Sequence, residues 1–338
     1  HVLRLAQEIA DGRMKIRPNC AARTLKADIE PIVRISQQAG IPIEAATFIG
    51  SSPIRQYAEN WELDRLVRYT EEAVRFSVEN GLPNMYVTED TTRARPETVR
   101  KLYTTAIECG ARRVVLTDTV GHVTPAGARA LVSFMKEVVA DTGEDVKIDW
   151  HGHSDRGLSV PNSLAATEAG ADRVHACALG IGERCGNTPM DILLVNLKLS
   201  GRIDNDLSRL AEYCRVVSEA VGVPIPANYP VVGADAFRTG TGVHAAAVIK
   251  ALTRDDRWLA DRVYSGVPAA EFGLRQKIEV GPMSGISNVQ YWLSSRGKPL
   301  DEALVRAIFE RAKASNRVLE DDEIEALVRE FISTASRA

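Results

Sequence analysis

Short apolar runs alternate with amphipathic helical patterns over the first 200 residues. Six runs have the length and apolar character of buried strands, and they span residues 14–22, 41–50, 82–90, 111–121, 145–153 and 171–180. Apolar residues recur at helical spacing before and between these runs, over residues 1–12, 64–80, 95–110, 124–143 and 161–171. This alternation predicts βα units and a parallel sheet.

Two architectures contain such units, a doubly wound sheet and a (β/α)8 barrel. No glycine-rich dinucleotide-binding motif follows any of the six runs, which favours the barrel. A barrel of this kind needs eight strands, so the fold class predicted is α/β, a TIM (β/α)8-type barrel that lacks its first two βα units. The chain starts at His1 inside a helical pattern, without an initiator methionine or an N-cap. We interpret it as a fragment, and we expect reduced stability and little or no turnover from it.

After about residue 200 the alternation stops. Helical patterns cover residues 205–222 and 299–315, and a proline-rich stretch follows the first of them at 223–233. We therefore predict a barrel domain over residues 1–200 and an α-rich C-terminal appendage over residues 201–338.

Composition narrows the classes of partner. The 338 residues are 45% hydrophobic and 26% charged, with a formal net charge of -3. No excess of basic residues favours nucleic acid or an anionic membrane surface. No apolar run approaches the roughly 18 residues of a membrane span, so a cytoplasmic protein is predicted. The five cysteines form an odd set without CxxC spacing, which predicts reduced thiols acting as small buried hydrophobic residues.

Candidate metal ligands occur at the end of the fifth run. His151 and His153 lie two residues apart on a predicted strand, so both side chains point to the same face. Two imidazoles suit a divalent transition ion, and added carboxylate or amide oxygens would also allow magnesium or manganese. The turn "GIGERCGN" at the next strand brings Glu183 and Asn187, whose amide oxygen is a further candidate ligand. The alternative is an ordinary pair of polar barrel residues beside a tight glycine turn.

The other histidines give weaker signals. His122 and His175 have no partner visible in the sequence, and we interpret both as structural. His244 stands at a predicted helix start after a glycine-rich loop, where a capping or surface role is the alternative to a functional one.

Five motifs in this order resemble one known family. They are "LTDTVG", "HGHSDRG", "GIGERCGN", "TGVHAAAVIKA" and "VGPMSGISNV". Together they are similar to the 2-isopropylmalate synthase and homocitrate synthase branch of the metal-dependent acyl-CoA condensing enzymes, the DRE-TIM metallolyases. The resemblance covers essentially the whole chain, and the paired HxH and GERxGN motifs are its specific part.

The resemblance implies an acyltransferase that condenses acetyl-CoA, as co-substrate, with a 2-oxo acid and then hydrolyses the thioester. It implies a divalent metal (Zn, Mn or Mg) held by His151 and His153, with Asn187 in or near the coordination shell. A homodimer is also implied, in which the appendage completes the partner's site. The residue roles that it implies involve Glu89 and Thr119 at the 2-oxo acid, Glu183 on the acyl-CoA side, His244 in proton removal, and Tyr264 as a weaker match in the same region. Val87 and Thr117 are expected to help build the substrate pocket.

Several positions depart from the family. The strand 1 motif with its metal-binding aspartate and catalytic arginine is absent, Ser154 stands where relatives usually have asparagine, and Arg156 stands where many have leucine. These departures leave open which 2-oxo acid is used, so 2-isopropylmalate, homocitrate, citramalate and benzylmalate-type synthases all remain alternatives. Two further alternatives for the function are a metal-dependent lyase or aldolase on the same barrel and a catalytically silent relative.

Overall fold

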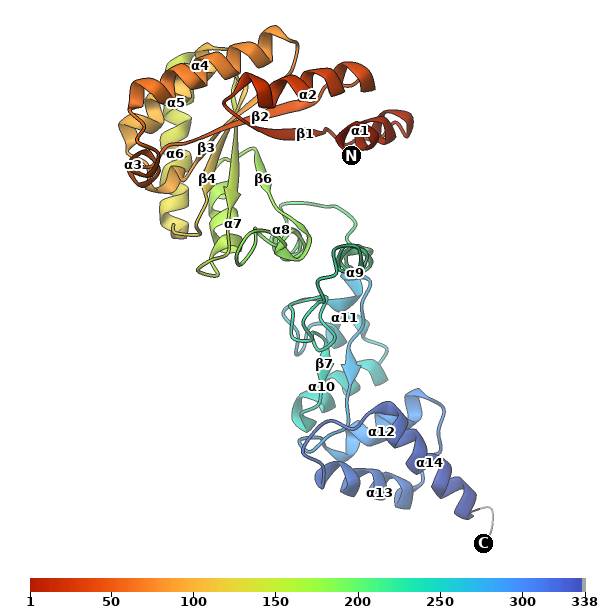
Figure 1. Ribbon diagram of the computed structural model, residues 1–338. Coiled ribbons are helices and arrows are strands. Elements are labelled where there is room, and N and C mark those ends of the chain that lie inside the picture. Colours follow the sequence, from red (N-terminus) through yellow and green to blue (C-terminus); the bar gives the residue numbers. More distant parts are fainter. Residues whose placement is uncertain (336–338) are drawn as a thin grey trace. The chain divides into compact units, whose positions relative to one another are not determined.

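The computed structural model describes residues 1–335, and the chain folds as two compact units. The first unit is His1–Leu193 and the second is Leu194–Ala338, with the division inside helix α8 (Met190–Leu199). Figure 1 shows the sheet-containing first unit in red to green and the second unit in green to blue.

The first unit is built on one parallel sheet whose six strands follow sequence order. The strands are β1 (Asn19–Arg23), β2 (Glu44–Gly50), β3 (Asn84–Glu89), β4 (Arg113–Asp118), β5 (Lys147–Gly152) and β6 (Arg173–His175). Each pairs with the next, and within residues 1–335 neither β1 nor β6 has a second partner strand. The predicted α/β barrel-type fold is therefore confirmed in the form of an incomplete, six-stranded parallel barrel sheet.

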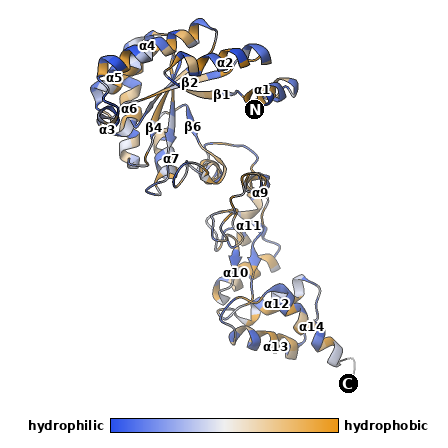
Figure 2. Cartoon of the chain, in the orientation of Figure 1, coloured by the Kyte–Doolittle hydropathy of each residue, from blue (hydrophilic) through white to orange (hydrophobic). Residues whose placement is uncertain are grey.

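Helices connect the strands and cover one face of this sheet (Figure 1). They are α1 (Val2–Asp11), α2 (Lys26–Ala39), α3 (Pro53–Glu59), α4 (Leu63–Glu79), α5 (Pro96–Glu108), α6 (Pro125–Thr142) and α7 (Ser159–Ala169). Figure 2 shows hydrophobic and hydrophilic residues sharing the surfaces of α4 and α5, as expected for helices with one apolar face. Tyr86, Leu116 and Trp150 point from the strands toward these helices and are fully buried. Packing against the helices therefore forms the main core.

The opposite face of the sheet is concave and carries charge where the strands begin. Asp149 on β5 is fully buried, and it accepts hydrogen bonds from Arg113 on β4 at 2.5 Å and from Arg173 on β6 at 2.6 Å. Burial opposes ionisation of Asp149, but a hydrogen bond from His175 and the charge of Arg173 hold its pKa below the ordinary value. Arg173 also reaches across to Glu44 on β2, with Nη2 3.0 Å from Oε2. These contacts connect β6 with β2, which lies four positions away in the sheet order.

The second unit is mostly helical. Its helices are α9 (Leu210–Val221), α10 (Gly242–Thr253), α11 (Arg257–Ala260), α12 (Ile286–Ser295), α13 (Glu302–Lys313) and α14 (Asp321–Ala335). Val289, Trp292 and Ile308 are buried in a core formed by α12, α13 and α14. Two short strands, β7 (Arg238–Thr239) and β8 (Lys277–Ile278), pair in parallel. The sequence gives no sign of them, because two residues are too few for a period-2 pattern.

The cysteine prediction is only half right. Cys109 and Cys214 are buried, Cys20 is half-buried, and Cys177 and Cys185 are exposed. In the part of the chain that the structure describes, no helix is long and apolar enough to cross a membrane.

The buried Asp149 gives a stability prediction. Asp149→Asn should lower the free energy of unfolding by about 2 to 3 kcal/mol, because it leaves the half-buried charges of Arg113 and Arg173 with Glu44 as their single shared carboxylate. Asp145→Asn is the matched control, since Asp145 is 87% exposed in its ion pair with Lys147 and should matter by less than about 0.5 kcal/mol. Urea unfolding followed by circular dichroism would compare the two. Equal effects would mean that the ion cluster adds nothing to stability.

Candidate active site

The concave face of the sheet holds a pocket of about 700 Å3 within the first unit. Side chains alternate across each strand, so every second residue of β2 to β6 faces this pocket. The pocket brings together all eight sequence-predicted residues of the first unit, which are Val87, Glu89, Thr117, Thr119, His151, His153, Glu183 and Asn187.

His151 and His153 converge as the period of two predicts. Their Nε2 atoms lie 3.2 Å apart, and the rings are 5.1 Å apart at 73°. Burial, with the nearby His175 and His153, lowers the pKa of His151 to about 3, and burial with the Arg184 charge lowers that of His153. Both imidazoles are therefore neutral near pH 7, and each has a lone pair to donate.

This donor pair fits a divalent ion. Two nitrogens at about 2.1 Å from one ion lie about 3 to 3.4 Å apart at ordinary bond angles, which includes the observed separation. The Nδ1 atom of His153 is also buried without a hydrogen bond among the described residues. Over residues 1–335 no group of three or more His, Cys, Asp or Glu side chains suits a metal. The candidate site therefore consists of two imidazoles, to which an amide oxygen can be added as a third ligand.

Asn187 is the candidate for that oxygen, and a tight turn holds it beside His153. The backbones of the two residues form an isolated bridge, and Asn187 Nδ2 donates to the carbonyl of Ile181 at 3.0 Å. A Cβ atom on Gly182 would meet Asn187 Nδ2 at 2.2 Å, so only glycine allows this approach. The amide nitrogen is thus committed to the turn, which leaves the amide oxygen as the ligand atom.

Glu89 and Thr119 meet at the ends of β3 and β4. Burial raises the pKa of Glu89 above its ordinary value, although the guanidinium of Arg55, 3.7 Å away, opposes the shift. Thr119 Oγ1 accepts a hydrogen bond from the backbone of Asp90 at 2.8 Å. The carboxyl group and the hydroxyl are thus held at one rim of the pocket.

A chain of hydrogen-bonded hydroxyl groups, most of them buried, holds Thr119 in place at this rim. Thr119 Oγ1 donates to Thr117 Oγ1 at 3.2 Å, and Thr117 lies 3.2 Å from Thr91 Oγ1. Thr91 in turn donates to the carbonyl of Thr88 at 2.8 Å and accepts from the backbone of Thr117 at 3.1 Å. Thr88 continues the chain to the buried Tyr103 hydroxyl at 3.0 Å. The position of Thr119 therefore depends on a hydrogen-bonded chain that begins in the helix-facing core.

The turn that carries Glu183 is clamped by its neighbour. Arg184 donates to Asp155 at 2.8 Å and to the carbonyl of Thr119 at 2.6 Å. The Glu183 side chain itself is 85% exposed. It therefore lies at the mouth of the pocket, where it can meet a ligand that arrives from solvent.

His244 and Tyr264 belong to the second unit and form their own pair. His244 is the third residue of α10, and its ring stacks on that of Tyr264 with centroids 4.2 Å apart and planes at 29°. Both side chains are exposed. The weak sequence match of Tyr264 thus coincides with a direct contact to His244.

Sequence reasoning missed the partner of His175. His175 lines the same pocket, its Nε2 lies 3.0 Å from Asp149 Oδ2, and its ring is 5.6 Å from that of His151. The sequence did contain a signal for it. His175 lies two residues after Arg173 on the predicted strand, so both side chains point to the same face. Asp118, in contrast, faces away from the pocket and accepts hydrogen bonds from the backbone of the following loop at His122 (2.8 Å).

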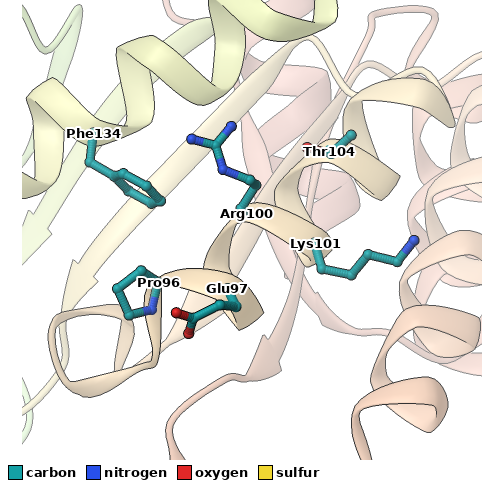
Figure 3. Close-up of a pocket in the computed structure, with 6 residues that line it drawn as sticks. All are labelled: Pro96, Glu97, Arg100, Lys101, Thr104 and Phe134. Atoms are coloured by element: carbon teal, nitrogen blue, oxygen red, sulfur yellow. The ribbon is translucent and has the colours of Figure 1, made fainter.

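A second hollow lies on the helix layer, away from these strand ends. It measures about 470 Å3 and lies between α5 and α6, where Figure 3 shows Arg100 beside Phe134. Arg100 is already paired with Asp141 at 2.5 Å and stacks over the Phe134 ring. The groove brings no set of reactive groups together, so the concave pocket is the candidate site.

Comparisons with known proteins identify the family to which the chain is similar. The family model described as HMGL-like matches residues 3–217. Homocitrate synthase AksA of Methanopyrus kandleri is 34% identical over 321 residues, which are 93% of this chain and 76% of that protein. The 2-isopropylmalate synthase of Sulfolobus acidocaldarius is 30% identical over 326 residues, which cover 94% of this chain and 79% of that protein. A crystal structure of Bacillus subtilis HMG-CoA lyase is 19% identical with a TM-score of 0.53, over 67% of this chain and 78% of that chain, which shows a shared fold.

The hydroxyl chain gives a second prediction. Thr91→Val should cost about 1 to 3 kcal/mol of unfolding free energy, because the buried backbone amide of Thr117 loses its acceptor. Thr91→Ser keeps the hydroxyl and should cost only about 1 kcal/mol for the lost methyl group. Thermal or urea unfolding of both variants measures the difference. If serine costs as much as valine, packing of the methyl group and not the hydrogen bond is what matters at residue 91.

Proposed function

The chain belongs to the HMGL-like family, and from that premise we propose that it is an acyltransferase that condenses acetyl-CoA with a 2-oxo acid. The observation that carries the proposal is the convergence of two neutral imidazoles in a pocket rimmed by a carboxyl and hydroxyl groups. The names of its relatives, homocitrate synthase and 2-isopropylmalate synthase, support the same reaction class.

His151 and His153 would hold a divalent metal, with the amide oxygen of Asn187 in or near its shell. When bound, the ion would supply Lewis-acid polarisation of the ketone of the 2-oxo acid. The lowered pKa values of His151 and His153 keep both imidazoles neutral, so neither must lose a proton before binding. The pair is therefore ready to bind an ion at neutral pH.

Residues at the rim would orient the two substrates. Thr119, held by the hydroxyl chain, and Glu89, held beside Arg55, are placed to bind the polar end of the 2-oxo acid. Val87 and Thr117 would contact the rest of that substrate. Glu183 at the exposed mouth would face the acyl-CoA.

A base must take a proton from the acyl methyl group so that the carbon can attack the ketone. We assign this to His244, because an imidazole accepts and returns a proton near pH 7 and the Tyr264 ring holds it in place. We further propose a homodimer in which His244 serves the partner's pocket, as the resemblance to the condensing enzymes implies. Hydrolysis of the thioester then releases CoA.

The function is tested by thiol release from acetyl-CoA on adding 2-oxo acids. We expect release that needs both a 2-oxo acid and a divalent metal, at well below the 1 to 10 per second that is roughly typical of enzymes, because the barrel sheet is incomplete. His151→Ala and His153→Ala should each lower metal affinity at least about a hundredfold, and Asn187→Ala by less. His122→Ala is the matched control, since His122 is exposed and outside the pocket. Wild-type metal content in folded His151→Ala and His153→Ala would remove the metal site, and metal-independent release would remove the mechanism.

Assembly gives a separate prediction. A His151→Ala subunit lacks the metal site and a His244→Ala subunit lacks the base, so each homodimer should be inactive. Mixed dimers contain one pocket with both groups, and about a quarter to a half of the wild-type rate should return if sites are shared. Subunit exchange would be checked with two tags. No recovery after proven exchange would place both groups of each site on one chain.

A further inference from the structure

We propose that the concave pocket selects a 2-oxo acid whose side chain is uncharged and apolar, and discriminates against dicarboxylic 2-oxo acids. The inference rests on the proposed function and concerns the part of the pocket next to the two histidines. Three features of the described residues carry it.

The first feature is an apolar wall on β2, β3 and β4. Phe48, Val87 and Val115 are register partners on these three strands, and all three line the pocket. Val115 is two residues before Thr117, which is the register partner of His151. Ala46, Met85 and Val115 are almost completely buried and form one apolar cluster with Val87. A substrate bound at the histidines thus meets hydrocarbon on this side, where an ionised carboxylate would lose its hydration without a partner.

The second feature is the absence of a spare buried cation. Arg173 lines the pocket below this wall, but its Nε lies 2.6 Å from Asp149 and its Nη2 lies 3.0 Å from Glu44. Arg113 pairs with the same two acids, at 2.5 Å and 3.4 Å. Two arginines therefore face two carboxylates, and this cluster offers no excess positive charge to the second carboxylate of a ligand.

The third feature is negative charge at the mouth. Glu89 and Glu183 both line the pocket, and the charge of Glu183 is among the causes, after burial, that raise the pKa of Glu89. A second carboxylate that reached the exposed side chain of Glu183 would be repelled there. Arg17 is the one lining cation for which residues 1–335 provide no acid partner, and it is exposed at the β1 side of the pocket. Among the residues that line the pocket, Arg17 is therefore the group that could favour a dicarboxylate.

The experiment measures binding directly, so that it does not depend on the rate of turnover. The full chain loaded with manganese would be titrated by calorimetry with 2-oxoisovalerate, which has a branched apolar side chain, and with 2-oxoglutarate. We expect 2-oxoisovalerate to bind at least about tenfold more tightly. Val87→Lys, which places a cation in the apolar wall, should shrink or reverse this ratio about tenfold or more. Val87→Met has similar length without charge and should keep the wild-type preference.

Each outcome has a distinct meaning. Tighter binding of 2-oxoglutarate by the wild type overturns the inference and leaves the proposed function intact, and loss of that preference in Arg17→Gln would identify Arg17 as the group that reads the second carboxylate. If neither 2-oxo acid binds to the metal-loaded chain, the proposed function fails and the inference fails with it. If Val87→Lys does not fold, the wild-type ratio and Val87→Met still decide the question.

Discussion

The buried carboxylate of Asp149 is the contact on which the geometry of the first unit depends. It accepts from Arg113 and Arg173, and Arg173 also reaches Glu44. These residues lie on strands β2, β4, β5 and β6, so a single ion cluster spans most of the sheet. Removing one member would leave partly buried charges with fewer partners, which lowers stability. The cluster therefore favours one curvature of the sheet over flatter alternatives.

Curvature at the start of the strands determines what meets at their ends. Two residues further along β5 and β6 from the ion cluster, His151 and His175 lie as register partners, with His153 following on the same face. The His175 ring is held by Asp149 on one side and contacts His151 on the other. A structural carboxylate thus connects the cluster to the candidate metal site through one imidazole, without itself facing the ligand.

The fold and half of the site can be predicted from local sequence alone, because period 2, period 3.6 and the HxH spacing are local properties. The six strands, the helices between them and the shared face of His151 and His153 are of this kind. The Asp149–His175 pair is different, since it joins residues 26 apart whose meeting depends on the register between β5 and β6. The strand pair β7–β8 was also missed, because its formation depends on tertiary packing. For the contact of His244 with Tyr264, the sequence offered only a weak motif match at Tyr264.

The pocket separates three kinds of chemistry by depth. Charge lies where the strands begin and is balanced within the cluster. Hydrocarbon covers the middle of the pocket on β2 to β4, and hydrogen-bonding and metal-binding groups lie at the ends of β3 to β6. A balanced ion cluster has a weak field at a distance, so the imidazoles above it can remain neutral while two arginines lie on the same face. If either arginine lacked its acid, its charge would lower the affinity of His151 and His153 for a cation. Exact pairing of the structural charges is thus a condition for the candidate metal site, and not only for the stability of the sheet.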